Sequence, residues 1–176
     1  MLKQKYLFIP AAVTALMLLT GCSSDENREN KTSAEEMATL LGTDSNNNGV
    51  RDDVEKKIYE KYEKPLHQAL LMDRAKFYQQ TLAQPLENAK NVQKMVSKNI
   101  ACQLYLRRLD NDIKSDSWRE TREYVKNLTF DNPQRVRKYL DYNLALSGGS
   151  YGSSPSDWNR DACSAEVVKS LEALGL

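Results

Sequence analysis

Apolar side chains recur at four-residue steps along most of this chain. Val50, Val54, Ile58 and Tyr62 form one series, and another begins at Val136. Steps of four place side chains on one face of an α-helix, whereas a half-buried strand would alternate apolar and polar residues. No segment alternates in this way over enough positions to indicate a strand. The spacing therefore predicts an all-α protein, a single domain of five to seven helices.

Punctuating residues place the ends of these helices. Gly42 ends the first, and Pro65 either interrupts the second or begins the next helix at its first position. Asp131-Asn132-Pro133 has the composition of a helix start. A loop rich in glycine and serine is expected over residues 147–156. The predicted helices cover approximately residues 34–41, 50–62, 65–83, 86–109, 118–128, 133–144 and 162–174.

The N-terminal residues have the features of an exported protein. Lys3 and Lys5 precede an apolar stretch over residues 7–19, which is shorter than the about 20 residues of a membrane span. Leu19-Thr20-Gly21-Cys22 resembles the lipobox of bacterial lipoproteins. The resemblance implies cleavage before Cys22, diacylglycerol on its thiol and acylation of the new amine with a chain such as palmitate. The alternative is an uncleaved anchor in which Cys22 stands by chance.

These features divide the chain into three parts: a signal peptide over 1–21, a lipidated flexible tether over 22–33 and a helical domain over 34–176. The tether is polar and lacks aromatic residues. The lipoprotein resemblance implies a periplasm-facing protein of the bacterial cell envelope. Ser23, rather than Asp, follows the cysteine, which resembles the pattern of enteric-like lipoproteins that are sent to the outer membrane rather than kept at the inner membrane.

The charge balance excludes one class of partner. Removal of Lys3 and Lys5 with the signal peptide leaves 23 basic and 24 acidic residues, a formal charge of −1. A nucleic-acid-binding protein would carry a basic excess or patch, so no nucleic-acid partner is expected. The near-neutral balance also gives no electrostatic reason to bind anionic lipid.

The remaining cysteines are Cys102 and Cys163, an even pair in an oxidising compartment. We expect them to form a disulfide with each other. The alternative is two free buried thiols. A metal site is not expected from two cysteines without a nearby histidine.

Residues 44–55, DSNNNGVRDDVE, fill every fixed position of the calcium-loop pattern D-x-[DN]-x-[DN]-G-x5-E. Calcium takes six to eight oxygen ligands at about 2.3–2.6 Å, and alternate residues of a tight loop point side chains at one centre. Gly49 allows the sharp bend. The expected ligands of a Ca²⁺ ion are Asp44, Asn46, Asn48, the carbonyl of Val50, Asp52 and Glu55.

The loop resembles EF-hands, and more closely the D-x-N-x-N-G-V-x-D loops of bacterial and thrombospondin type 3 proteins. Arg51 departs from the EF-hand pattern, because that position is usually apolar and pairs with a second hand. No second loop is found, since 110–112 lacks the glycine and the glutamate. One structural site between the first two helices is therefore expected, with a dissociation constant of about 10⁻⁴ to 10⁻³ M. The alternative is an Asn/Gly turn before a helix with an acidic first turn.

Other candidate sites are weaker. Residues 148–152 match G-x-S-x-G, but a helix precedes them where a nucleophile elbow needs a strand. His67 is the only histidine, and it lies upstream of that serine, whereas the hydrolase family places it downstream. Loop carboxylates at Asp110, Asp112 and Asp116 are assigned no role.

The sequence therefore favours a non-enzymatic, lipid-anchored envelope protein with a structural calcium site that binds a protein partner. One specific version is an immunity or inhibitor lipoprotein, which would need an exposed patch rich in Tyr and Trp, such as one with Trp118 or Trp158. The rival is a calcium-dependent cell-wall hydrolase. A cleft with two or more acids outside residues 44–55 would favour the rival.

Overall fold

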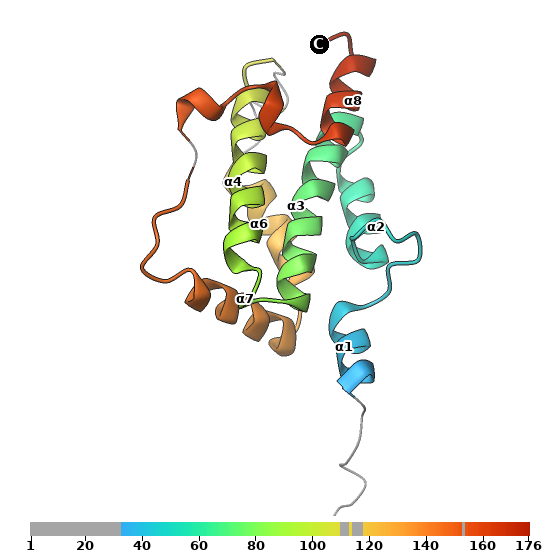
Figure 1. The fold of residues 1–176 in the computed structure, drawn as a ribbon. Helices are drawn as coiled ribbons and strands as arrows, with labels where there is room; N and C mark the ends of the chain where they lie inside the picture. Colours follow the sequence, from blue (N-terminus) through green and yellow to red (C-terminus); the bar gives the residue numbers. More distant parts are fainter. Residues whose placement is uncertain (1–32, 110–112, 114–117, 153) are drawn as a thin grey trace, which may run out of the picture. The chain divides into compact units, whose positions relative to one another are not determined.

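The computed structural model describes residues 33–109, 113, 118–152 and 154–176. Over these residues the chain is all-α, with seven α-helices, two 3-10 helices and no strand (Figure 1). The predicted fold class is confirmed. The signal peptide, Cys22 and most of the tether lie outside the described residues, as do Asp110, Asp112 and Asp116. No helix of the described part is long and apolar enough to cross a membrane.

Local chemistry sets several helix ends where the sequence predicts them, whereas α4 and α8 are shorter than their predicted ranges. Pro65 and Pro133 each begin a helix, and the side chain of Asn132 accepts a hydrogen bond from the backbone N–H of Arg135. Gly42, with φ of +73°, follows the first helix. The elements are α1 Ser33–Leu41, α2 Asp52–Lys61, α3 Pro65–Ala83, α4 Ala89–Leu106, α6 Trp118–Thr129, α7 Pro133–Ala145, η2 Pro155–Asp157, η3 Arg160–Ala162 and α8 Ala165–Ala173.

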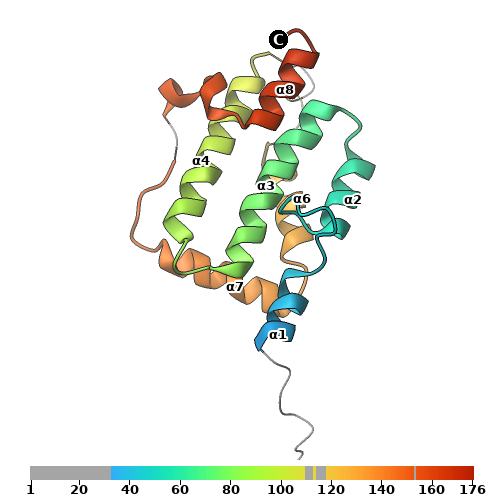
Figure 2. The same cartoon turned by 45° about the vertical axis from the view of Figure 1, so that its right-hand side comes forward.

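Helix α3 is the central element of the domain. It packs against α1, α2, α4, α6, α7 and α8, and Figure 2 shows α4 beside it. Eleven of its 19 residues are buried, so it is surrounded on most sides. The sequence indicates only one apolar face, because two of the buried residues, Asp73 and Arg74, are charged.

Three groups of buried apolar side chains form the core around α3. The first joins α2, α3 and α6, the second joins α3, α4 and α8, and the third joins α4 to α7. Representative members are, in that order, Ile58, Leu82 and Val125; Leu66, Leu106 and Leu171; Ala89, Val92 and Tyr142.

A buried polar network crosses from α3 to α4. Arg74 is 2% exposed, and its guanidinium donates to Asn99 Oδ1 at 2.6 Å and to Gln103 Oε1 at 3.2 Å. Asn99 in turn donates to the backbone carbonyl of Leu70 at 3.2 Å. Burial lowers the pKa of Arg74. The buried guanidinium of Arg74 thus donates to the side-chain amide oxygens of Asn99 and Gln103. These hydrogen bonds fix the register of α3 against α4.

Helix α7 is present as predicted, but its apolar series at four-residue steps is not buried. Val136, Leu140 and Leu144 are 41%, 60% and 71% exposed. Arg135 and Tyr142 are the buried residues of this helix. The four-residue series therefore marks a surface stripe on α7 rather than a core face.

The predicted disulfide is present: Cys102 on α4 is bonded to Cys163, which lies between η3 and α8. Replacement of both cysteines by alanine should lower the free energy of unfolding by about 4 kcal/mol, because the bond closes a loop with a sequence separation of 61. Urea unfolding of the variant beside oxidised and reduced wild type measures this. Reduced wild type should match the variant, and a loss below about 1 kcal/mol would contradict the expectation.

Candidate metal centre

The loop of residues 42–51 connects α1 to α2, as predicted, and its backbone turns sharply. Asn47 has φ of +56° and Gly49 has φ of +84°. Asparagine and glycine are the residues that tolerate this left-handed region best. Asp44 stabilises the turn, because its two carboxylate oxygens accept hydrogen bonds from the backbone N–H groups of Asn48 at 3.1 Å and Gly49 at 2.8 Å.

Four of the predicted ligand side chains lie together. Glu55, in the first turn of α2, reaches back over the loop, and its Oε2 accepts from the side-chain amides of Asn46 at 3.1 Å and Asn48 at 2.8 Å. Asn48 also accepts from the backbone N–H of Val50 at 2.8 Å. Asp44 is joined to the same group through the backbone of Asn48. The acidic and amide side chains therefore surround one small region of the loop.

Asp52, another predicted ligand, has a different hydrogen-bond partner. Its carboxylate accepts from the backbone N–H of Ser45 at 2.9 Å and from the hydroxyl of Ser45 at 2.6 Å. These hydrogen bonds lower the pKa of Asp52. The side chain of Val50, another predicted position, is buried in the core with Val54 and Ile58, so only its carbonyl is available as a ligand.

The residues of the loop fit a hard cation better than a soft one. Among the described residues, no three side chains of His, Cys, Asp or Glu gather closely enough to hold a metal. Any ion in this loop would therefore depend on amide and main-chain oxygens in addition to Asp44 and Glu55. Such a ligand set suits Ca²⁺, which prefers oxygen ligands in flexible geometry, and does not suit Zn²⁺.

Arg51, which departs from the EF-hand pattern, points into the protein and is 2% exposed. Its guanidinium donates to the carbonyls of Leu128 at 3.0 Å and Thr129 at 3.3 Å, the last residues of α6. A cation at this position satisfies carbonyls that the helix leaves unpaired. Asp53 and Asp131 accept from Arg51 at 2.9 and 2.8 Å. Burial opposes the charge on Arg51, but these two carboxylates outweigh burial and raise its pKa.

Arg135 on α7 donates hydrogen bonds to the last carbonyls of α1, as Arg51 does to those of α6. It donates to the carbonyls of Leu40 at 2.8 Å and Thr39 at 3.3 Å, and it pairs with Asp131 at 2.7 Å. Asp131 therefore bridges Arg51 and Arg135. We call Arg51, Asp131 and Arg135 the arginine bridge, which connects the candidate calcium loop to α1, α6 and α7. Sequence patterns did not identify it, because its hydrogen bonds span up to 96 positions.

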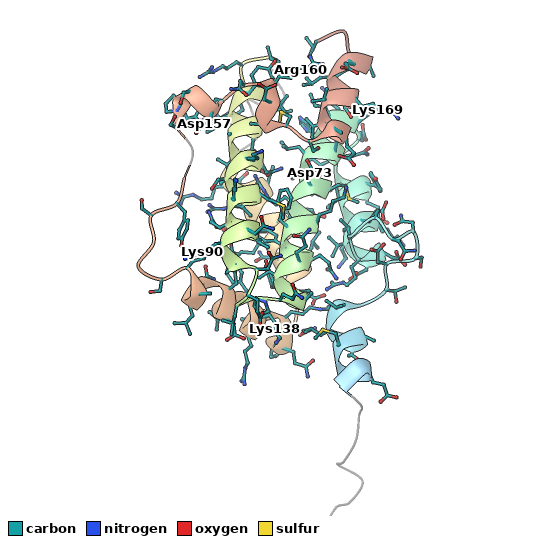
Figure 3. All side chains as sticks on the ribbon, in the orientation of Figure 1. Asp73, Lys90, Lys138, Asp157, Arg160 and Lys169 are labelled. Carbon is teal, nitrogen blue, oxygen red and sulfur yellow. A yellow bond between two sulfur atoms is a disulfide. The ribbon has the colours of Figure 1, made fainter. Side chains whose placement is uncertain are left out.

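A cleft of about 400 Å³ lies next to the loop, between α2, α3 and α8. Asn48, Tyr59, Asp73, Lys76, Glu166 and Lys169 are among its lining residues; Asp73 and Lys169 are labelled in Figure 3. Burial raises the pKa of Asp73, and Ser164 and Lys76 partly oppose that rise. A second cleft, of about 390 Å³, contains Asp157, Asp161, Lys94 and Lys98. Each cleft gathers two acids outside the loop, which is the feature that the hydrolase hypothesis requires.

The remaining candidates have little support. The G-x-S-x-G segment follows α7, and no strand precedes it among the described residues. His67 is buried near the start of α3 and packs edge-on against Tyr62, with ring centroids 6.2 Å apart. Trp158 is half-buried, with Arg108 5.3 Å from its ring centroid.

No protein-family model, curated protein or solved structure significantly matches this chain.

The arginine bridge yields a test at Gly42. A Cβ atom there would lie 2.3 Å from Arg51 Cδ, and Gly42 also has positive φ. Gly42→Ala should lower the free energy of unfolding by about 2–4 kcal/mol, from left-handed strain and overpacking together. Gly148→Ala is the matched control, because Gly148 has φ of +80° but open space around it. The control should lose only about 1–2 kcal/mol. Equal losses in urea unfolding would show that Arg51 moves aside without cost.

The Asp73 cleft yields a test of pH dependence. The pKa of Asp73 is raised in the folded state, so its ionisation destabilises the fold once the pH exceeds its ordinary value near 3.8. Asp73→Asn should therefore increase stability at pH 7, and the gain should shrink as the pH falls toward 4. Glu166, whose pKa is lowered mainly by a backbone hydrogen bond, has the opposite sign.

Glu166→Gln serves as the control in this series. It should reduce stability at pH 7, with the loss also shrinking toward acid pH. Urea midpoints at several pH values measure both variants. A loss of stability in Asp73→Asn at pH 7 would show that the Ser164 hydrogen bond, rather than burial, dominates at Asp73.

Proposed function

We propose that this chain is a non-enzymatic lipoprotein of the bacterial envelope whose helical domain binds a protein partner and is stabilised by one calcium ion. Leu19-Thr20-Gly21-Cys22 supports the lipid anchor, with Cys22 as the acylated residue. The same motif and Ser23 support a periplasm-facing position at the outer membrane. The partner is unknown in identity, and the near-neutral charge argues against nucleic acid.

One observation carries the calcium part of the proposal: the Glu55 carboxylate lies within hydrogen-bond distance of both Asn46 and Asn48. The glutamate that ends the sequence pattern is thus next to two residues from its beginning. A simple turn before a helix would not need a side chain of α2 to reach back over the loop. Asp44 holds the turn, and Asp52 and the Val50 carbonyl complete the proposed ligand set.

The calcium ion would have a structural role in this proposal. Three carboxylates and two neutral amides in an extracellular loop correspond to a dissociation constant of about 10⁻⁴ to 10⁻³ M. Calcium outside the cytoplasm would keep such a site filled. The ion would neutralise the carboxylates of Asp44 and Glu55, and the arginine bridge would hold the other side of the loop.

Two alternatives remain as candidates. The hydrolase hypothesis is favoured by the cleft that contains Asp73 and Glu166, because their surroundings shift the two carboxyl pKa values in opposite directions. Only a hydrolase would release fragments from peptidoglycan, which separates it from the main proposal.

The immunity or inhibitor hypothesis has less support. Among the described Tyr and Trp residues with recorded exposure, Tyr59 and Tyr151 are the most exposed, and they lie in separate segments.

A calcium titration of residues 23–176 tests the main proposal. We expect saturable binding of about one ion per chain in calorimetry. Saturating calcium should stabilise the fold by about 1–3 kcal/mol in thermal melts, because the ion binds the folded state alone. Asp44→Ala and Glu55→Ala should each abolish both effects.

Glu60→Ala is the control, because Glu60 lies on α2 and forms an exposed ion pair with Lys56 at 3.8 Å. It removes one negative charge from the same helix without touching the loop, so calcium binding should be unchanged. No binding in wild type at several millimolar calcium would reduce residues 44–55 to a turn that begins a helix.

A further inference from the structure

Helix α7 carries a stripe of three exposed apolar residues. Val136, Leu140 and Leu144 follow each other at four-residue steps, so they lie on one face of the helix. Leu144 is 71% exposed, the highest value among the large hydrophobic residues. Single exposed leucines are ordinary, but an aligned series on one helix marks a surface that contacts something else.

The stripe lies on a helix at the α1 end of the domain, and α1 is the described element nearest in sequence to Cys22. Figures 1 and 2 both show α7 crossing the end of α3 that lies beside α1. The hydrogen bonds from Arg135 to Leu40 and Thr39 join α7 directly to α1. The turn between α3 and α4 is at the same end, since Ala89 and Val92 pack against Tyr142 of α7.

Further apolar side chains are exposed on these same elements. Met37 on α1 is 39% exposed, and Leu86 in the turn between α3 and α4 is 54% exposed. Charged residues accompany them: Lys90 and Lys138 are labelled at this end in Figure 3, Arg137 is exposed on α7, and Glu35 and Glu87 are exposed on α1 and in the turn. Asp141 is the one acidic residue within α7 itself. Apolar side chains bordered by Arg and Lys are typical of helices that lie in a membrane interface.

The distance from the lipid site limits what this end can reach. Ser33, the first residue of α1, is eleven positions after Cys22. Even a fully extended chain of that length spans only about 40 Å. Helix α3, with 19 residues, is about 28 Å long. A lipid on Cys22 would therefore hold the start of α1 within about 40 Å of the bilayer, so the α1 end can reach the membrane surface while the opposite end, with α8, faces away from it.

We propose that the α7 stripe is a membrane-docking surface, on which Val136, Leu140 and Leu144 insert among lipid headgroups while Arg137, which lies beside the stripe, faces the phosphates. The proposal rests on the lipid anchor of the proposed function. The several acyl chains implied at Cys22 would already attach the protein, so the stripe would not be needed for attachment itself. The docking would instead fix the orientation of the domain, so that α8 and the clefts beside it point into the periplasm.

The test uses the full chain, purified as the mature protein and placed in vesicles of phosphatidylethanolamine and phosphatidylglycerol. An environment-sensitive fluorophore is attached at Leu144→Cys, Leu140→Cys or, as the control, Leu174→Cys. Leu174 is 56% exposed and follows α8. The introduced cysteine is the only free thiol, because Cys102 and Cys163 are bonded and Cys22 would carry lipid.

We expect blue-shifted emission at positions 140 and 144, with loss of most of their intensity to headgroup spin labels, and no change at position 174. Water-like emission at all three positions, or equal shifts at all three, would overturn the docking surface. Mass spectrometry of the N-terminal peptide separates this result from the anchor. A lipidated Cys22 with water-like probes leaves the anchor intact and assigns the stripe to a protein partner, whereas an unmodified Cys22 removes both proposals.

Discussion

The hydrogen bonds of the Arg51 guanidinium are the interaction on which the rest of this structure depends most. One buried cation, which belongs to the candidate calcium loop, satisfies the last carbonyls of α6 and pairs with Asp53 and Asp131. A buried arginine without carboxylates would be costly, because burial opposes its charge. Asp131 reduces that cost and brings in Arg135, whose own bonds end at α1. Four helices that are distant in sequence thereby meet at one set of charges.

This arrangement explains how a single calcium-type loop can keep its conformation without pairing with a second EF-hand loop. In paired EF-hands the residue at the Arg51 position is apolar and packs against its partner loop. Here the side chain turns toward α6, and Val50 and Val54 place the neighbouring backbone in the core. The inner side of the loop is thus held by protein contacts, whereas the side that carries Asp44, Asn46 and Glu55 stays open. A site with this division is preorganised by the fold, so an ion would add stability without having to create the turn.

Much of the fold could be predicted from local sequence, because local chemistry determines helix ends. Pro65, Pro133 and Gly42 mark boundaries whatever the tertiary contacts are. The pairing of Cys102 with Cys163 followed from simple counting, and the loop residues followed from a fixed spacing. The arginine bridge and the polar contacts of Arg74 could not be predicted, since they depend on residues that only the fold brings together. Polar residues in a core carry no periodic signal. The sequence of α3 therefore predicted a single buried face, although the helix is buried on most sides.

The exposed face of α7 follows from the same physics. Helix α7 is attached through Arg135, whose partners are carbonyls and Asp131, and through Tyr142, which donates to Gln93 at 2.6 Å. Such contacts have fixed directions, so they decide which side of the helix faces the domain even when the opposite side is more apolar. A rule that places every aliphatic series in the core fails wherever directional hydrogen bonds orient a helix. The leucines that remain outside are then free to serve binding, and an aliphatic stripe that the fold does not use is better evidence for a contact surface than any single exposed side chain.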